Sequence, residues 1–184
     1  MVIFNMNRLL PPPLRGCNDV FKGGFTLIEL LVVMAIMSIL VVISVSQFQT
    51  AKKKGNDVAR KSDLNGVSKA LQMYFADYGV MPSVSDDGKI VVGGVAVDWG
   101  GEFKDGDYVY MKVMPKENSL SLPPYCYKTD TGLKKYALFA QLENTVDKEC
   151  DGHTYTCENG TSNKTYCFAY VSPNTSLLPN GDLQ

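Results

Sequence analysis

The longest apolar stretch of the chain runs from Leu27 to Val45, and only Glu29, Ser38 and Ser44 interrupt it. Neither proline nor glycine occurs within it. As an α-helix with a rise of about 1.5 Å per residue, the stretch is roughly 28 Å long, which matches the hydrocarbon core of a bilayer. Because a backbone in lipid must satisfy its own hydrogen bonds, the pattern predicts a membrane-spanning helix, which we assign to residues 25–46.

Beyond this stretch the apolar positions follow the period of an amphipathic helix. Five large side chains recur at intervals of three or four residues: Leu64, Val67, Leu71, Tyr74 and Tyr78. The same helix is therefore expected to run from Phe25 to Tyr78, with Gly79 and Pro82 as its end signals. The charged residues of this region are expected on its other faces: Asp57, Arg60, Lys61, Asp63 and Lys69.

A short motif precedes the apolar stretch. Residues 22–29 read Lys-Gly-Gly-Phe-Thr-Leu-Ile-Glu. This order resembles the leader junction and mature N-terminus of type IV pilins and type II secretion pseudopilins. In that family an aspartic peptidase in the membrane cleaves after the glycine and methylates the new terminal amine. The resemblance implies that residues 1–24 are a cleaved prepilin leader, that the cut falls between Gly24 and Phe25, and that Phe25 becomes N-methylated.

Glu29 would be the fifth residue of the mature chain. A carboxylate in the apolar phase of a membrane is costly unless it is paired or reaches the interface. One interpretation is that Glu29 extends to the lipid headgroups. The other is that it pairs with the positively charged amine of Phe25 on a neighbouring subunit, since N-methylation would keep that charge. The second interpretation gives Glu29 a role in filament assembly, where the pair would set the register of packed helices.

Residues 47–184 are predicted to form an extracytoplasmic head that includes the amphipathic half of the helix to about residue 79. Short runs rich in tyrosine and aliphatic residues, separated by turn signals, indicate an antiparallel sheet. The expected strands are a hairpin of Ile90–Val92 and Val95–Val97, followed by Tyr125–Thr129, Lys134–Leu142 and Thr165–Val171. The predicted fold class is α+β, with a long N-terminal helix packed on a small antiparallel sheet, as in pilins.

The chain has five cysteines, of which Cys17 would be lost with the leader. The even number that remains in an exported head predicts two disulfides. We expect the pair Cys150–Cys157, which closes a short loop, and the pair Cys126–Cys167, which joins two strands. The alternative is a zinc site, because His153 lies between Cys150 and Cys157 at a spacing that metal ligands use.

Acidic residues near these cysteines raise the question of a metal. Asp147, Glu149 and Asp151 could bind calcium, but the loop pattern of major pseudopilins is not reproduced, so we predict no metal site. The chain has a single histidine and no Ser-His-Asp set. A membrane-anchored enzyme is therefore the remotest alternative, and we expect no catalytic residue, cofactor or small-molecule substrate.

The charge balance bears on binding to nucleic acid. The formal net charge is −1, and removal of residues 1–24 takes away three basic residues and one acidic residue, which leaves −3. That balance gives no general case for a nucleic-acid partner. Lys52, Lys53 and Lys54 form the only local basic cluster, so a pilin-like subunit for DNA uptake remains the alternative function.

The predicted function is structural, as a subunit of a type IV pilus or a type II secretion pseudopilus. The resemblance implies four partners: the prepilin peptidase and N-methyltransferase, copies of the chain and other pilins or pseudopilins, the inner-membrane assembly platform, and the membrane itself. We expect a single-pass membrane protein with a cytoplasmic N-terminus and an extracytoplasmic head. It would become a fibre subunit at the cell surface or in the periplasm.

Overall fold

The computed structural model describes residues 24–157, 164–173, 175–178 and 180–184. The predicted leader up to Gly23, including Cys17, lies outside the described residues. The described chain forms one long helix followed by short strands, and it divides into two units, residues 1–44 and 45–184. The expected α+β class, with a long N-terminal helix packed on small antiparallel sheets, is confirmed.

Helix α1 spans Leu27–Tyr78, which confirms the helix expected from the sequence to within two residues at its start. Its most apolar window of 18 residues has a mean hydropathy of 2.8, and none of that window is buried. By length and composition the helix is therefore suited to cross a membrane. It ends where Gly79 adopts a φ of 68°, a left-handed conformation that glycine tolerates and that is common just beyond a helix.

A three-stranded sheet and a hairpin follow α1 in the second unit. Strands β1 (Ser83–Val84), β2 (Ile90–Val92) and β3 (Val95–Val97) form an antiparallel sheet in that order. The turn between β2 and β3 is the glycine turn expected from the sequence. Strands β4 (Phe103–Asp105) and β5 (Tyr108–Met111) form the second hairpin, which the sequence did not predict.

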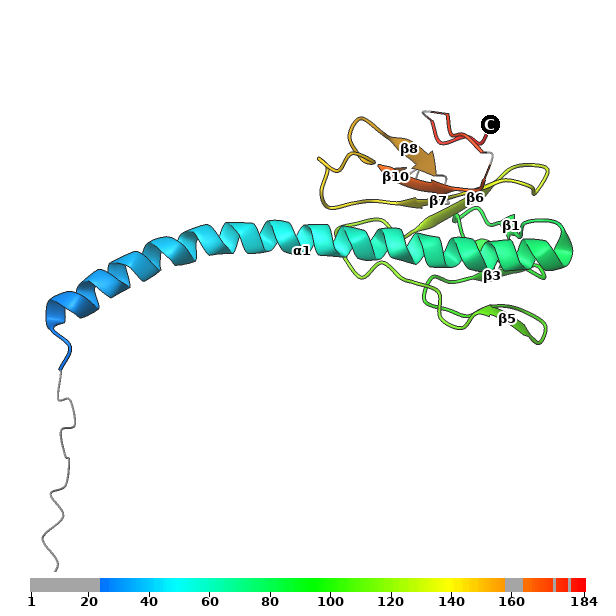
Figure 1. Ribbon diagram of the computed structural model, residues 1–184. Coiled ribbons are helices and arrows are strands. Elements are labelled where there is room, and N and C mark those ends of the chain that lie inside the picture. The colour runs from blue at the N-terminus through cyan, green and yellow to red at the C-terminus, as the bar shows by residue number, and fades with distance from the viewer. Residues whose placement is uncertain (1–23, 158–163, 174, 179) are drawn as a thin grey trace, which may run out of the picture. The chain divides into compact units, whose positions relative to one another are not determined.

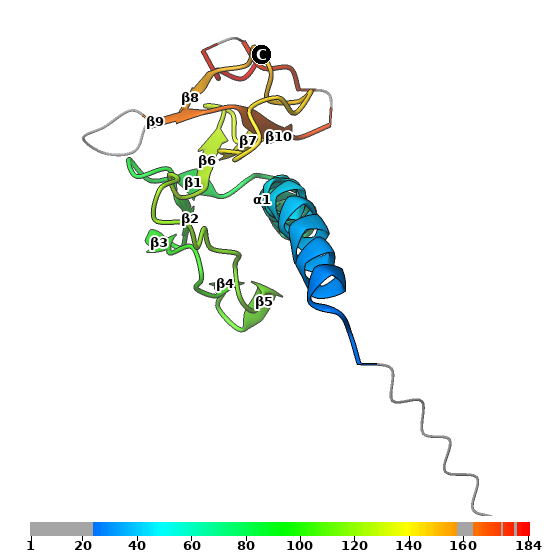
Figure 2. The ribbon, with the colours of Figure 1, turned by 90° about the vertical axis from the view of Figure 1, so that its left-hand side faces the viewer.

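The central sheet of the head consists of β6 (Cys126–Thr129), β7 (Tyr136–Ala140) and β10 (Phe168–Val171), with β7 in the middle. Strands β8 (Tyr155–Cys157) and β9 (Lys164–Tyr166) pair with each other. The single strand expected at Thr165–Val171 is therefore wrong, since the chain bends at Cys167 between β9 and β10. Figures 1 and 2 show the central sheet on one side of the C-terminal half of α1 and the β4–β5 hairpin on another.

Both faces of β7 are buried, so the head has two apolar cores. Leu138 faces α1 and packs in a core with Leu64 and Leu71. Phe139 faces the other way and packs with Cys126 and with residues of the β8–β9 pair. This division follows from the alternation of side chains along a strand. Four residues of the stripe predicted on α1, Leu64, Val67, Leu71 and Tyr74, form the helix side of the larger core, whereas Tyr78 is 48% exposed.

Two disulfides join the four cysteines of the head, as predicted, but the predicted pairing is wrong. The bridges are Cys126–Cys157 and Cys150–Cys167. Because β7 separates β6 from β10, Cys126 and Cys167 lie about two strand spacings apart, roughly 10 Å, which exceeds the reach of a disulfide. They also belong to the cores on opposite faces of the sheet. The zinc alternative is wrong as well, because the thiols it requires are oxidised.

Candidate assembly site

The start of α1 is a capping box formed by Thr26 and Glu29. The backbone N–H and the hydroxyl of Thr26 both donate to Oε2 of Glu29 at 2.8 Å. In return the N–H of Glu29 donates to the Thr26 hydroxyl at 3.3 Å. Such reciprocal bonds satisfy backbone donors that have no partner at a helix N-terminus. One oxygen of Glu29 is thus occupied by Thr26, and the described residues offer no hydrogen bond to the other, Oε1.

The predicted cleavage site lies just outside this cap. Gly24 and Phe25 precede the helix and are exposed, with 88% of Phe25 accessible. A β-carbon built on Gly24 would meet no atom within 4 Å. The peptide bond between the two residues therefore belongs to open, non-helical backbone.

The apolar part of α1 buries none of its large side chains. Leu27, Val32 and Val45 are examples, each about half exposed or more, and the same holds for every large apolar residue between them. Soluble monomers rarely expose a contiguous apolar patch of this extent, so the segment needs another partner: lipid, a second protein chain, or each in turn.

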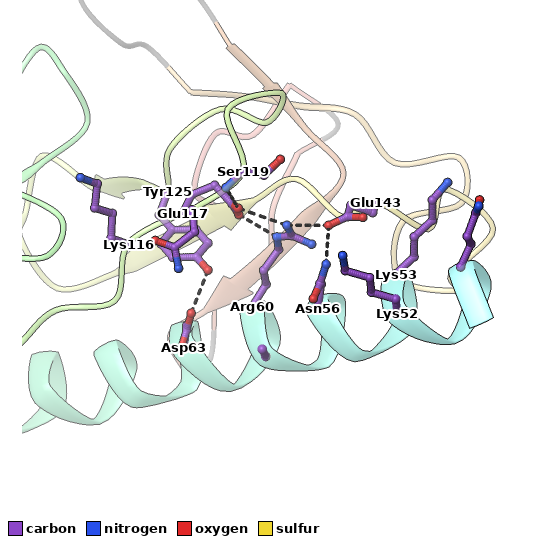
Figure 3. Close-up of a pocket in the computed structure, with 13 residues that line it drawn as sticks. Lys52, Lys53, Asn56, Arg60, Asp63, Lys116, Glu117, Ser119, Tyr125 and Glu143 are labelled. Atoms are coloured by element: carbon purple, nitrogen blue, oxygen red, sulfur yellow. Dashed lines mark hydrogen bonds and ion pairs between the residues drawn. The ribbon is translucent and has the colours of Figure 1, made fainter. Parts of the chain in front are cut away.

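In the head, a buried group of charged residues holds α1 to two loops (Figure 3). The Arg60 guanidinium donates to Glu117 at 2.6 Å, to Asp57 at 2.9 Å and to Glu143 at 2.9 Å. Asp57 accepts in addition the backbone N–H groups of Glu143 and Asn144 at 2.8 and 2.9 Å. One turn of the helix thereby fixes the segments that begin at residues 117 and 143.

The ionisation of this group follows from its contacts. The hydrogen bond to Glu117 raises the pKa of Arg60 further above its already high ordinary value. Burial opposes ionisation of Glu117, but the hydrogen bonds from Arg60 and from the backbone N–H of Ser119 hold its pKa below the usual range. Bonds from Asn56 and Arg60 lower the pKa of Glu143 in the same way. Glu117 and Glu143 therefore remain charged at neutral pH.

Lys61 binds the acidic residues that the sequence offered to calcium. Its ammonium group lies 2.9 Å from Asp147 and 2.5 Å from Glu149, and 5.3 Å from the ring centroid of Phe168. Asp151 is exposed. The positive charge in this loop is thus supplied by a side chain of α1.

The sequence placed Asp57 and Arg60 on the outer faces of the helix, and this prediction is wrong, since the two are 2% and 5% exposed. The partners of Arg60 lie 57 and 83 residues further along the chain, where no periodic pattern marks them. A signal within α1 was available, because Asp57 and Arg60 lie seven and four residues before Leu64 and so continue the spacing of the apolar stripe on the face that packs in the head.

Comparison with known proteins identifies the prokaryotic N-terminal methylation motif at residues 21–45. The chain is 32% identical over 85 residues to prepilin peptidase-dependent protein A of Clostridium perfringens, which covers 43% of this chain and 61% of that protein. It is 43% identical over 54 residues to the type IV wide pilus major component PilA4 of Thermus thermophilus, which covers 29% and 41% respectively. The chain thus spans less than two thirds of either relative. No solved structure matches it significantly.

These findings confirm the resemblance to the type IV pilin and pseudopilin family. The chain is a type IV pilin-like protein that carries the prepilin-type methylation motif at the start of α1. Proteins of this family are typically structural and not enzymes. The apolar helix and the relatives point to the membrane or the pilus surface as its location.

Proposed function

We propose that the protein is a structural subunit of a type IV pilus or a type II secretion pseudopilus. A prepilin peptidase would cleave it after Gly24 and methylate Phe25, and the inner-membrane assembly platform would then add it to a filament of like subunits. The observation that carries the proposal is that the methylation motif, residues 21–45, includes a helical apolar segment that the described chain leaves unburied.

The geometry around the proposed cleavage site supports processing. A peptidase must bind its substrate in an extended form, and the Gly24–Phe25 bond already lies outside the helix. Because Gly24 has no side chain, the backbone on the leader side of the bond can approach a protease closely. Cleavage would leave the capping box of Thr26 and Glu29 intact, since neither residue is on the leader side.

The exposed apolar side chains of α1 would serve the subunit in two successive environments. In the monomer residues 25–46 would span the bilayer and face lipid. In the filament the same side chains would face the helices of other subunits. Burial of each leucine or isoleucine against lipid or protein removes it from water at a gain of about 1.5–3 kcal/mol. The transfer from one apolar environment to the other is therefore nearly balanced, and polar contacts must decide the register.

Glu29 is suited to make such a contact without breaking its own cap. Oε2 holds both donors of Thr26, which reduces the cost of a carboxylate in lipid. Oε1 remains able to accept from the Phe25 amine of an adjacent subunit. A charge-assisted bond of this kind is stronger in a medium of low dielectric constant than in water. We infer that it fixes the axial position of neighbouring subunits.

The test is to express the chain in its native host and follow both processing and fibre formation. Mass analysis of the N-terminal peptide should give a chain that begins at monomethylated Phe25. Glu29→Leu should still be inserted and cleaved, because the change makes the span more apolar and leaves residues 22–26 unchanged. Its yield in sheared fibres should fall at least tenfold, which corresponds to the loss of about 1.4 kcal/mol per contact.

Ser44→Leu is the matched control, because it adds the same side chain within the same span and removes only a bond to the Leu40 carbonyl. Its fibre yield should stay normal. A mature chain that began elsewhere than Phe25 would refute the processing step. Normal fibre yield from Glu29→Leu would instead show that Glu29 only reaches the headgroups.

A further inference from the structure

A pocket of about 540 Å³ in the head has aromatic walls. Trp99 and Tyr125 line it, and their ring centroids lie 5.6 Å apart in an edge-to-face arrangement. Pro124, which is exposed, adds a third apolar surface. We call this cavity the Trp99 pocket. Its volume falls within the range of about 300–1,000 Å³ that is typical of small-molecule sites.

The indole N–H of Trp99 lacks an acceptor. Its Nε1 is the one buried side-chain nitrogen or oxygen in the described part of the chain that has no hydrogen-bond partner. The hydroxyl of Tyr125, by contrast, donates to Asp63 at 2.9 Å. Because a buried donor without an acceptor costs free energy, nearly all such groups in proteins are paired. The exception indicates that an acceptor from outside the chain belongs beside Trp99.

The loop that carries Trp99 is held in place by hydrogen bonds. The N–H of Gly101 donates to the carbonyl of Asp98 at 2.8 Å, and the N–H of Met114 donates to the carbonyl of Gly101 at 2.7 Å. The ammonium group of Lys89 lies 2.8 Å from the carboxylate of Asp98. The Trp99 pocket is therefore formed before any ligand arrives, which lowers the entropic cost of binding.

One side of the pocket can open further. Lys116 is exposed, and its side chain extends away from Arg60 (Figure 3). Its stem lies against the Trp99 loop, since a β-carbon built on Gly100 would be 3.4 Å from Cδ of Lys116. A lysine stem has four flexible carbons and can make way for a ligand that approaches the indole.

The rim of the pocket is charged but balanced. It contains two carboxylates and two ammonium groups, from Asp87, Asp98, Lys89 and Lys116. Glu117 also lines the pocket, but both of its oxygens accept hydrogen bonds from Arg60. The free rim thus has no net charge, which favours a neutral ligand over an anion or a cation. It offers donors and acceptors in equal number.

We propose that the Trp99 pocket binds a neutral saccharide. A hydroxyl group both donates and accepts, so the hydroxyls of a sugar can use the carboxylates and the ammonium groups of the rim at once. The C–H groups of a sugar ring are attracted to the negative face of an aromatic ring. A proline-rich peptide also fits aromatic walls, but its carbonyls only accept and would leave the carboxylates without a donor. The inference goes beyond the proposed function and concerns the head alone.

The test begins with the full chain in a detergent that has no sugar headgroup. The labelled protein is applied to a printed array of neutral and charged glycans, with decaproline as the peptide probe. The neutral glycan that binds best is then titrated while the emission of Trp99, the one tryptophan of the chain, is recorded. Binding should shift the emission maximum, because the ligand changes the surroundings of the indole.

Two substitutions at the rim locate the site without removing buried side chains. Asp87→Ala and Lys116→Ala should each weaken the binding of that glycan about threefold to tenfold, the effect expected from one lost hydrogen bond. The matched controls are Asp107→Ala and Lys112→Ala, which remove the same charges from exposed positions outside the pocket. Their affinity should equal that of the unaltered chain.

The inference would be overturned if no neutral glycan on the array bound, or if only charged glycans or decaproline did. It would also be overturned if the rim variants and their controls bound the glycan equally well, since the glycan would then lie elsewhere. None of these results bears on the proposed function, because N-terminal processing and fibre yield are measured independently of the Trp99 pocket.

Discussion

Replacement of Arg60 by leucine should destabilise the head by about 3–5 kcal/mol at neutral pH. The side chains of Arg60, Asp57 and Glu117 are at most 6% exposed, and that of Glu143 is 23% exposed. Leucine keeps the apolar part of the side chain but removes the only guanidinium among these carboxylates. Breaking a buried pair by removing one partner is costly because the other charge stays behind without compensation. We expect a destabilisation of about 3–5 kcal/mol, as for other broken buried pairs, because Glu117 loses two hydrogen bonds from Arg60.

The loss should depend on pH with a definite sign. In the native head Glu117 and Glu143 have pKa values below their ordinary 4.5, so their charged forms stabilise the fold above that pH, and this contribution disappears as pH falls through the folded-state values. Without Arg60, burial raises the pKa of Glu117, so that a bound proton then favours the folded state. The difference in stability between the two proteins should therefore be largest near neutral pH and shrink below about pH 4.5.

Urea unfolding of the detergent-solubilised chain, followed through the fluorescence of Trp99, measures this difference. Trp99 reports on the same region because its ring lies 5.6 Å from that of Tyr125, which binds Asp63 of α1. Lys69→Leu is the control, since it removes an exposed charge from the same helix and should change the free energy of unfolding by less than about 0.5 kcal/mol. A stable Arg60→Leu head, or a loss equal at neutral and acidic pH, would contradict the reasoning.

Two further predictions concern the frame of the head. Removal of the Cys126–Cys157 bridge by paired serine substitutions should cost about 3.7 kcal/mol and removal of Cys150–Cys167 about 3.1 kcal/mol, from the entropy of the loops of 31 and 17 residues they close. Urea unfolding would measure the two losses in free energy of unfolding. Non-reducing peptide mapping that found other cysteine pairs would refute the prediction. Gly79→Ala should lose about 1–2 kcal/mol because of its positive φ, whereas Gly55→Ala, in open space within the helix, should gain about 0.5–1 kcal/mol. If thermal melts showed Gly79→Ala to be more stable than Gly55→Ala, the backbone φ of the glycine would not determine the effect of the substitution.

Local patterns in the sequence predicted the elements whose signal is contained in a few residues. The apolar run and the stripe from Leu64 to Tyr78 gave the helix, and Gly79 gave its end. The β2–β3 hairpin followed from its paired glycines. The disulfide pairing could not be obtained in this way, because it depends on which strand lies between β6 and β10. That order is a property of the sheet and leaves no trace in the spacing of the cysteines.

Among the polar residues, too, those in a contiguous motif could be predicted from the sequence, and those brought together by the fold could not. The motif before the apolar run is contiguous, so the sequence alone was enough to predict roles for Gly24, Phe25 and Glu29, and these roles stay predictions. The capping bond from Thr26 to Glu29 also fits the pattern of a capping box, although its use was not foreseen. The Arg60 group is assembled from three distant segments. Asp57 and Arg60 continue the spacing of the apolar stripe of α1, but no local pattern marks Glu117 and Glu143 as their partners. Only the fold shows that they share one cation.

The buried charges also fix the axial position of α1 in the head, which apolar packing alone does not determine. Apolar residues recur along α1 at every third or fourth position, so a shift of the helix by one turn, about 5.4 Å, would place one apolar side chain where another had been. Hydrogen bonds tolerate changes of only a few tenths of an ångström, and Arg60 makes them to both loops at once. The Arg60 group therefore specifies one axial position of α1 in the head. If subunits are assembled through α1, as proposed, Glu29 supplies the corresponding constraint between neighbouring helices, because lipid-facing leucines and valines have no register of their own.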